Sequence, residues 1–332
     1  MILWSGFVAC TLVIVYSGIK LAKYGDIIAE KTGLGKTLTG MVLLATVTSL
    51  PELVTGISSV TYADVPDIAT GDVLGSCVFN LLIFVLLDLF YRPMPLSSKA
   101  HRGNILSAGF GILLLSIVAI SLFLGSRLFP LGWIGPYSLL IIGVYFAAVR
   151  MGYFYEKKQL SGFIKGIAVE LKHEGISKKT AFIRYGQNAF LVAVAAVFLP
   201  VIGEGLAKST GLGQTFVGNI FIALSTSLPE LVVCITAVKI DAVDLAIGNI
   251  FGSNIFNVFI LAVDDLFFVR GPILSLVNPN HIISALFAVI MTAVAVIGLM
   301  YRAEKKYFLA WDSISIGLLY LINLMMLFLV KK

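Results

Sequence analysis

Charged side chains are scarce in this chain. Of its 332 residues, 13% are charged and 59% are hydrophobic, and the mean hydropathy is +1.00. A soluble domain of this length needs a far more polar surface. The composition therefore excludes a soluble globular protein and predicts a membrane protein with several spans.

Cysteine and histidine are also rare. The residues are Cys10, Cys77 and Cys234, and His101, His173 and His281. The cysteines lie inside hydrophobic stretches, which excludes a disulfide framework. The histidines are scattered without the spacing of metal ligands, so we expect them at the surface or the membrane interface. Nothing in the sequence predicts a bound cofactor.

Hydrophobic stretches occupy most of the chain. They fall near 2–22, 37–62, 68–91, 104–124, 129–149, 181–206, 214–238, 244–268, 280–301 and 308–330. Each is long enough for the roughly 20 residues that a transmembrane helix needs. The sequence predicts an all-α, polytopic protein of the cell membrane with ten transmembrane helices.

The positive charges indicate how the helices are oriented. The formal net charge is +6, which could suggest a nucleic-acid partner. If the N-terminus is outside, however, all but five of the 24 Lys and Arg fall in connections that face the cytoplasm. This is the positive-inside bias of membrane proteins. It predicts that both termini are outside and that nucleic acid is not a partner.

The chain contains an internal repeat. Thr-Ser-Leu-Pro-Glu-Leu-Val occurs at 48–54 and again at 226–232, an offset of 178. A second block, with Gly75-Ser76 and Phe79-Asn80, recurs as Gly252-Ser253 and Phe256-Asn257 at an offset of 177. Each half then holds five spans, and because five is odd the second half enters the membrane inverted. Transporters of this kind bind their substrates near the midplane on interrupted helices.

The repeat also predicts the domain organisation. Residues 1–149 would form the first five-helix repeat and residues 181–332 the second. Residues 150–180 would connect them in the cytoplasm. Within this connection, Phe163, Ile164, Ile167 and Leu171 are spaced like one face of a short amphipathic helix on the inner leaflet.

The repeated heptapeptide places an acid beside a proline at membrane depth. Pro51 and Pro229 each remove a backbone donor and should open their helices, freeing the carbonyls of Val47 and Ser225. Opened backbone is tolerated there only inside protein or beside a water-filled cavity. Glu52 and Glu230 read as parts of an ion or proton pathway.

The polar residues of the repeats can form an oxygen cage. The candidate ligands are Glu52, Glu230, Thr48, Thr226, Ser49, Ser227, Ser76, Ser253, Asn80, Asn257 and the backbone carbonyls of Ala45 and Ala223. On a continuous helix, Thr48 would share a face with Glu52, and Thr226 with Glu230. A cage without thiolate or imidazole suits Ca²⁺, Na⁺ or Mg²⁺ and not transition metals. Two glutamates neutralise one Ca²⁺, and competition with Na⁺ for the same oxygens would give antiport. Packing between helices is the alternative role for each Ser, Thr and Asn.

Other acids lie in the predicted spans 68–91 and 244–268. Asp88, Asp264 and Asp265 fall near helix ends, so we expect them to be solvated. Asp72 lies four residues before Ser76 on the same helical face. It could add charge near the cage or form a hydrogen bond between helices.

On these motifs the chain resembles the cation/Ca²⁺ antiporter superfamily, most closely its sodium/calcium exchanger branch of the prokaryotic type. The resemblance covers nearly the whole chain. It implies that the two glutamates, with the two threonines beside them, bind Ca²⁺ centrally. It further implies that the four serines and the two alanine carbonyls bind Na⁺ at flanking positions, with the two asparagines in the middle. The first and sixth helices would slide over a rigid core.

Four residues depart from the pattern of that family. Val47 and Ser225 stand where Gly usually precedes Thr-Ser-Leu-Pro-Glu. Asn257 stands where many sodium/calcium exchangers carry Asp, which argues against K⁺ co-transport. Asp72 stands where Asn is usual, as at Asn249 in the second half.

The resulting hypothesis is a Na⁺/Ca²⁺ antiporter that exports Ca²⁺ and functions as a monomer in the lipid bilayer. The alternative is an H⁺-coupled antiporter of Ca²⁺, or of another divalent cation, with the same fold. An enzyme is not expected, because an intramembrane aspartyl protease needs two close acids and Asn249 supplies no partner for Asp72. A passive channel would leave the two inverted proline motifs unexplained.

Overall fold

A computed structural model describes residues 2–32, 46–91, 95–99, 102–160, 176–239, 242–301 and 309–330. In these ranges the chain is helical and forms no strand beyond an isolated bridge between Leu131 and Ile134. The prediction of an all-α membrane protein is confirmed. In the described part of the chain, nine helical segments are long and apolar enough to cross a membrane.

The long helices correspond to predicted spans. They are α1 (Ile2–Thr32), α4 (Pro66–Phe90), α6 (Arg102–Leu124), α7 (Pro136–Leu160), α8 (Lys178–Thr210), α10 (Ala223–Lys239), α11 (Val243–Phe267), α13 (His281–Tyr301) and α14 (Trp311–Leu329). The shorter elements are α3 (Leu50–Ser58), η1 (Ser59–Ala63), α5 (Leu96–Lys99), η2 (Gly125–Arg127), α9 (Gln214–Val217), η3 (Gly218–Ile222) and α12 (Ile273–Leu276). The predicted span 37–62 is described only from residue 46 onward, so the count of ten spans stays a prediction.

The burial of the helices follows their place in the bundle. Most of α4 and α11 is buried, and the two helices pack against each other at the centre. Helices α1, α7 and α14 instead expose large apolar side chains such as Leu12, Phe146 and Leu321. An apolar outer surface suits lipid, because the hydrocarbon core offers no water to polar groups.

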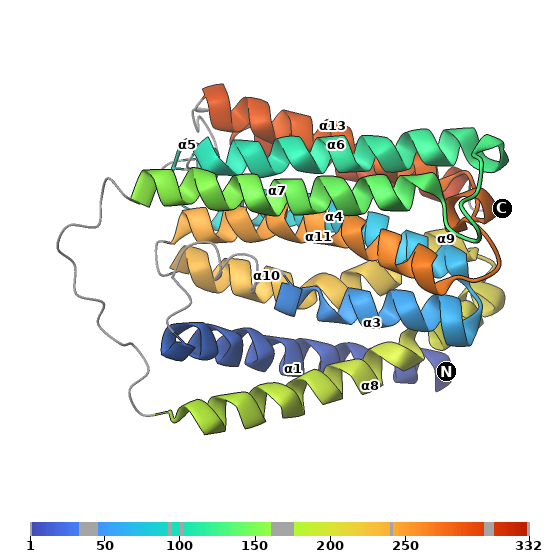
Figure 1. Cartoon of the computed structure of the whole chain (residues 1–332), viewed down its shortest axis with the longest axis horizontal. Helices are drawn as coiled ribbons and strands as arrows, with labels where there is room; N and C mark the ends of the chain where they lie inside the picture. The colour runs from blue at the N-terminus through green and yellow to red at the C-terminus, as the bar shows by residue number, and fades with distance from the viewer. Residues whose placement is uncertain are drawn as a thin grey trace.

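Figure 1 shows the arrangement of the bundle. Helices α6, α7 and α13 lie on one side, α4, α11, α10 and α3 lie in the middle, and α1 and α8 form a pair on the opposite side. Helix α1 packs against α8 and α10, and α8 also packs against α3. Both ends of the chain lie at the same end of the bundle, opposite the end where α7 stops and α8 begins.

Corresponding helices of the two halves run in opposite directions, as an inverted repeat requires: α1 against α8, and α4 against α11 (Figure 1). Cys77 and Asn254, which the offset of 177 relates, contact each other. Asn254 Nδ2 donates to the Cys77 carbonyl at 3.2 Å, and Cys77 Sγ lies 3.8 Å from the Asn254 carbonyl oxygen. This reciprocal contact supports the repeat, while the domain boundaries stay a prediction.

The one-residue difference between the two offsets has a structural counterpart. The offset changes from 178 to 177 between residues 54 and 71. The π-helix η1 (Ser59–Ala63) lies in this interval and directly follows α3. The wider turn of a π-helix takes up an additional residue within a helix. The first half therefore accommodates its extra residue without lengthening α3.

The prediction that Asp88 and Asp265 are solvated is wrong, because both side chains are buried. Asp88 accepts from the backbone N–H of Leu96 at 2.9 Å and of Ala310 at 3.0 Å. Asp265 accepts from the backbone N–H of Ile273 at 2.7 Å and of Gly135 at 2.8 Å. Carboxylates satisfy and stabilise helix N-termini in this way. Each aspartate thus joins a short helix of its own half to the last span of the other.

The prediction of a surface position for His281 is also wrong. His281 is fully buried at the start of α13. Its Nε2 lies 3.0 Å from Asp67 Oδ1, and its Nδ1 lies 3.3 Å from Asn219 Nδ2. The start of α13 packs over the start of α4, so the ring is covered although it lies near a helix end. His101 and His173 lie outside the described residues.

Candidate ion-binding site

The first proline motif interrupts its helix as predicted. Residues 46–48 are helical, Ser49 is a turn with φ −87° and ψ 16°, and α3 begins at Leu50. Pro51 lies in the first turn of α3, where a missing N–H breaks no hydrogen bond of the helix. The helix is therefore interrupted at Ser49, the residue that precedes the repeated Leu-Pro-Glu.

The second proline motif differs from the prediction. Pro229 lies inside α10, which continues without interruption to Lys239. The irregular backbone lies about two turns earlier, in the π-helix η3. Gly75 of α4 lets this segment approach closely, because a Cβ at Gly75 would lie 2.6 Å from the Cα of Asn219. Gly75 thus permits close packing between α4 and η3.

The two glutamates are held by reciprocal hydrogen bonds. Ser227 Oγ donates to Glu52 Oε1 at 2.8 Å, and Ser49 Oγ donates to Glu230 Oε1 at 3.0 Å. The two serines are related by the repeat offset of 178. All four side chains are buried. The same contact is thus made twice, each time between one half and the other.

The threonines follow the same crossed pattern. Thr226 lies close to Glu52, and Thr48 lies close to Glu230. The prediction that each threonine shares a face with the glutamate of its own half rests on a continuous helix, and the turn at Ser49 breaks that continuity in the first half. The hydroxyls of each half instead approach the acid of the other.

Helices α4 and α11 contribute the remaining predicted side chains, Ser76, Asn80, Ser253 and Asn257, all buried. Asn80 Nδ2 donates to Asn254 Oδ1 at 3.0 Å. Asn254 is a residue that the sequence analysis did not select. The Ser76 hydroxyl lies close to Glu52 and Asp72 but is not in hydrogen-bond geometry with either.

Of the two backbone carbonyls predicted as ligands, the structure describes only that of Ala223. Ala223 is buried, and its carbonyl accepts from Thr226 Oγ1 at 3.2 Å. Ala45 lies outside the described residues. The carbonyl oxygen of Ala223 retains a second lone pair for another partner.

Several buried polar atoms at the site have no hydrogen-bond partner within the described ranges. They are Glu52 Oε2, Glu230 Oε2, Ser76 Oγ, Ser253 Oγ, Asn80 Oδ1 and both polar side-chain atoms of Asn257. A buried unsatisfied group typically costs about 1–3 kcal/mol. A bound cation would supply the partner that these oxygens lack.

Asp72 adds a third acid at the site. It is fully buried, and its Oδ1 accepts from Thr226 Oγ1 at 2.8 Å. Asp72 is also within electrostatic range of Glu52. Both roles predicted from the sequence therefore have support, since Asp72 bonds across helices and places a carboxyl group near Glu52.

The described part of the chain provides no basic side chain to these acids. Its ion pairs are Lys208–Glu204, Arg270–Asp64 and His281–Asp67. Nor do three His, Cys, Asp or Glu side chains of that part converge into a metal cluster. Buried charges are normally paired or bound to metals. The arrangement suits cations held by carboxylates together with hydroxyl, amide and carbonyl oxygens.

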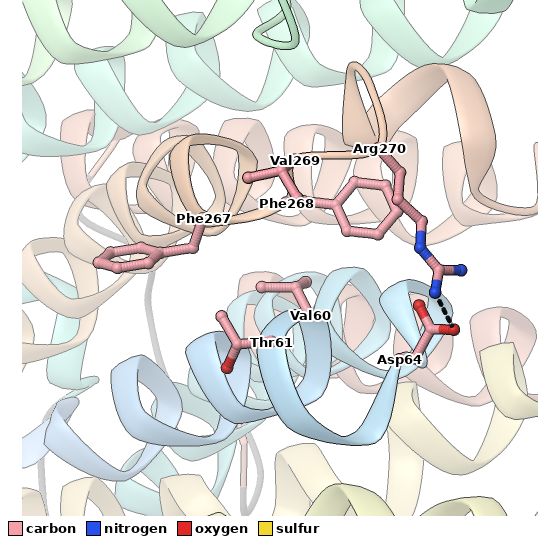
Figure 2. A pocket seen from close by; sticks show the side chains of 7 residues that line it. All are labelled: Val60, Thr61, Asp64, Phe267, Phe268, Val269 and Arg270. Carbon is pink, nitrogen blue, oxygen red and sulfur yellow. Dashed lines mark ion pairs between the residues drawn. The ribbon is translucent and has the colours of Figure 1, made fainter.

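A surface pocket lies at the end of the bundle that holds both termini. It has a volume of about 300 Å³ and is lined by Val60, Thr61, Asp64, Phe267, Phe268, Val269 and Arg270. Figure 2 shows Arg270 reaching across to Asp64, and their charged atoms are 2.7 Å apart. None of the twelve predicted ligands lines this pocket.

Comparison with known proteins relates the chain to ion exchangers. The family described as "Sodium/calcium exchanger protein" matches residues 2–153 and 187–329. The sodium/calcium exchanger MaX1 of Methanosarcina acetivorans is 25% identical over 343 residues, covering 92% of this chain and 93% of that protein.

Two solved structures share the fold. A structure of the sodium-calcium exchanger NCX_Mj superposes with a TM-score of 0.62 at 19% identity, covering 98% of both chains. The H⁺/Ca²⁺ exchanger CAX superposes with a TM-score of 0.69 at 12% identity, covering 99% of this chain and 84% of that one. The same architecture is thus found in proteins named for two different coupling ions.

Proposed function

This chain belongs to the sodium/calcium exchanger protein family, and from that membership we propose that it is a Na⁺/Ca²⁺ antiporter that exports Ca²⁺ in exchange for Na⁺. The membrane-spanning helices and the match to the exchanger family support the proposal. The coupling ion, the binding residues and the direction of transport are the proposed parts.

The observation that carries the proposal is the crossed pair Ser227–Glu52 and Ser49–Glu230. Each glutamate has one oxygen bound by the other half and one oxygen without a partner in the described chain. The two carboxylates together neutralise one Ca²⁺, whose coordination by flexible oxygen ligands is irregular. Threonine, serine, asparagine and carbonyl oxygens nearby offer neutral ligands for Na⁺.

Competition between the ions would couple their movements. A cage without a cation leaves buried acids unpaired, which is costly in a low-dielectric interior. The empty carrier should therefore interconvert slowly between its two orientations, while the loaded carrier crosses. Exchange follows from this difference and needs no second binding site.

Helices α1 and α8 pack against the segments that carry the two proline motifs. A Cβ at Gly18 of α1 would lie 2.7 Å from Pro229 Cγ, so α1 crosses directly over the second proline motif. Helix α8 packs against α3, which carries the first motif. Because α1 and α8 also pack on each other, we propose that they slide together to alternate access.

The proposed topology places both termini outside the cell membrane. It rests on the positive-inside bias of the sequence and on the position of both termini at one end of the bundle (Figure 1). The two halves of the chain together supply both crossed serine–glutamate pairs. The proposed functional unit is therefore a monomer.

One observation favours a second candidate, an H⁺-coupled Ca²⁺ antiporter of the same fold. Asp72 places a third buried carboxylate close to the cage, and its Oδ2 has no partner in the described chain. An additional acid could carry a proton in place of Na⁺. The transport assay must therefore separate the two coupling ions.

The test is ⁴⁵Ca²⁺ uptake into proteoliposomes loaded with Na⁺, compared with choline-loaded vesicles and with vesicles given a pH jump. Uptake that requires internal Na⁺ and does not respond to the pH jump is the expected result. Uptake driven by the pH jump alone would replace the proposal by the second candidate. Absence of uptake under either gradient would contradict Ca²⁺ antiport.

A further inference from the structure

Asp264 is a buried acid that the cage does not use. Its side chain is fully buried near the end of α11, and neither carboxylate oxygen has a hydrogen-bond partner in the described part of the chain. The expectation of a solvated Asp264 is therefore wrong. The adjacent Asp265 differs, because it accepts from Gly135, Ile273, Tyr137 and Ser138.

A glycine makes room for this carboxylate. A Cβ at Gly56 of α3 would lie 2.8 Å from Asp264 Cγ, so the acid rests against the backbone of α3. Gly56 follows Glu52 by four residues, one turn along the same helix. Both oxygens thus lie beside the helix that carries the first glutamate of the cage.

Asp264 also faces the cage along its own helix. It follows Asn257 by seven residues, which places the two side chains on the same face of α11 about 10 Å apart along the axis. Asp264 is within electrostatic range of Asp72, which in turn is within range of Glu52. The three acids therefore form a series that leads from the cage toward the end of the bundle that holds both termini.

The surface pocket lies one turn beyond Asp264. Val60 follows Gly56 by four residues, and Phe268 follows Asp264 by four residues; both line the pocket and both are buried. Figure 2 shows these residues with Asp64 and Arg270 at the pocket. Asp264 thus lies between a surface opening and the central oxygens, with an apolar layer on its outer side.

The repeat does not require an acid at this position. The offset of 177 relates Asp264 to Leu87, and the offset of 178 relates Gly56 to Cys234. At the equivalent positions, Leu87 therefore occupies the place of the acid, and Cys234 occupies the place of the glycine. The acid is a feature of one side of the molecule and not a consequence of the duplicated fold.

We propose that Asp264 is a further cation ligand that binds one Na⁺ between the surface pocket and the central cage. This inference rests on the proposed Na⁺/Ca²⁺ exchange and adds to it a Na⁺ position on one side only. A single carboxylate matches a monovalent cation. An ionised carboxylate without a partner is costly in this interior, and a bound cation would offset that cost. Asp72 Oδ2, which has no partner in the described chain, is the nearest further acid toward the cage.

The test is equilibrium binding of ²²Na⁺ to the purified full-length protein, which does not depend on Ca²⁺ transport. Asp264→Asn keeps the shape of the side chain and removes its charge. We expect it to bind one Na⁺ fewer, or to raise the Na⁺ concentration for half-saturation of that site at least about tenfold, because one partner of a buried charge pair is lost. Half-saturation by ⁴⁵Ca²⁺ should stay within about twofold, since the charge lies about two turns from the central oxygens.

Two further variants keep the test decisive. Gly56→Ala retains the acid but displaces it, and should weaken the same Na⁺ site even if Asp264→Asn folds poorly. Glu204→Gln is the matched control, because it removes a negative charge from a partly exposed ion pair and should leave Na⁺ binding unchanged.

The outcomes separate this inference from the proposed exchange. Unchanged Na⁺ number and affinity in both Asp264→Asn and Gly56→Ala would overturn the Asp264 site and leave the exchange proposal intact. A change confined to the pH dependence of transport would overturn the assignment of Na⁺ to Asp264. Absence of Na⁺ binding by the unmodified protein would overturn both.

Discussion

Two regions that the repeat makes equivalent differ in charge. The Glu52 side consists of Glu52, Gly56, Asp72 and Asp264, and the Glu230 side consists of Glu230, Cys234, Asn249 and Leu87. The first holds three buried acids and the second holds one. On the Glu230 side, Asn249 Nδ2 donates to Cys234 Sγ at 3.5 Å, so two neutral groups contact each other there.

The difference shows which parts of the site the duplication preserves. The crossed serine–glutamate contacts are the same on both sides within 0.2 Å (2.8 and 3.0 Å). The surrounding positions differ in charge, in side-chain volume and in backbone, since only the first proline motif interrupts its helix. We infer that the shared contacts serve the ion bound at the centre, and that the unshared acids distinguish the two routes to it.

The largest expected effect tests what the two sides share. Glu52→Gln and Glu230→Gln should each reduce Na⁺-dependent ⁴⁵Ca²⁺ exchange in proteoliposomes by at least about 100-fold, because each removes half of the charge that neutralises Ca²⁺. The two variants should be equally impaired. Wild-type rates in either one would show that the crossed pair is not the Ca²⁺ site.

The next prediction concerns the two buried aspartates that join the halves. Asp265→Asn should lower the free energy of unfolding by about 3 kcal/mol or more, since the carboxylate serves buried backbone and hydroxyl donors. Thermal unfolding in detergent measures this change, with Asp88→Asn as the equivalent variant on the other side. A melting temperature unchanged in both variants would mean that these contacts do not stabilise the bundle.

A smaller effect should follow when the two sides are made alike. Asp72→Asn gives the Glu52 side the residue that the Glu230 side has, and should raise the Na⁺ half-saturation of exchange by roughly three- to tenfold, a cost of about 1 kcal/mol. Thr226 can still donate to the asparagine carbonyl, so Ca²⁺ exchange should persist. The reciprocal variant Asn249→Asp should alter Na⁺ dependence in the opposite direction. Equal Na⁺ dependence in all three proteins would remove Asp72 from the site.

The smallest expected effect concerns the surface pocket. Arg270→Gln breaks the ion pair with Asp64, in which the two side chains are 65% and 46% exposed. Exposed pairs contribute about 0–1 kcal/mol, so the melting temperature should change little. A large loss of stability would show that the pair holds η1 and α11 together and is not a rim contact.

The sequence allowed much of the site to be predicted, because its signals are local. Two acids beside prolines at membrane depth are improbable without a function, and the repeat marks the other polar residues that recur with them. The burial of Asp88 and Asp265 was missed, since a residue near a helix end usually meets water. In this protein the last span of the opposite half covers that end. His281 also lies near a helix end, where the start of α4 covers it.

Composition, hydrophobic run lengths and the duplicated motifs were enough to establish an all-α membrane protein and to predict that two acids act together in it, because hydrophobicity and repetition can be read directly from the order of residues. The folded arrangement was needed to show that Ser49 bonds Glu230 and Ser227 bonds Glu52, that Pro229 leaves its helix intact, and that Gly56 lies against Asp264. Those contacts join segments up to about 200 residues apart. They depend on how the helices pack across the bundle, which the spacing within a helix does not encode.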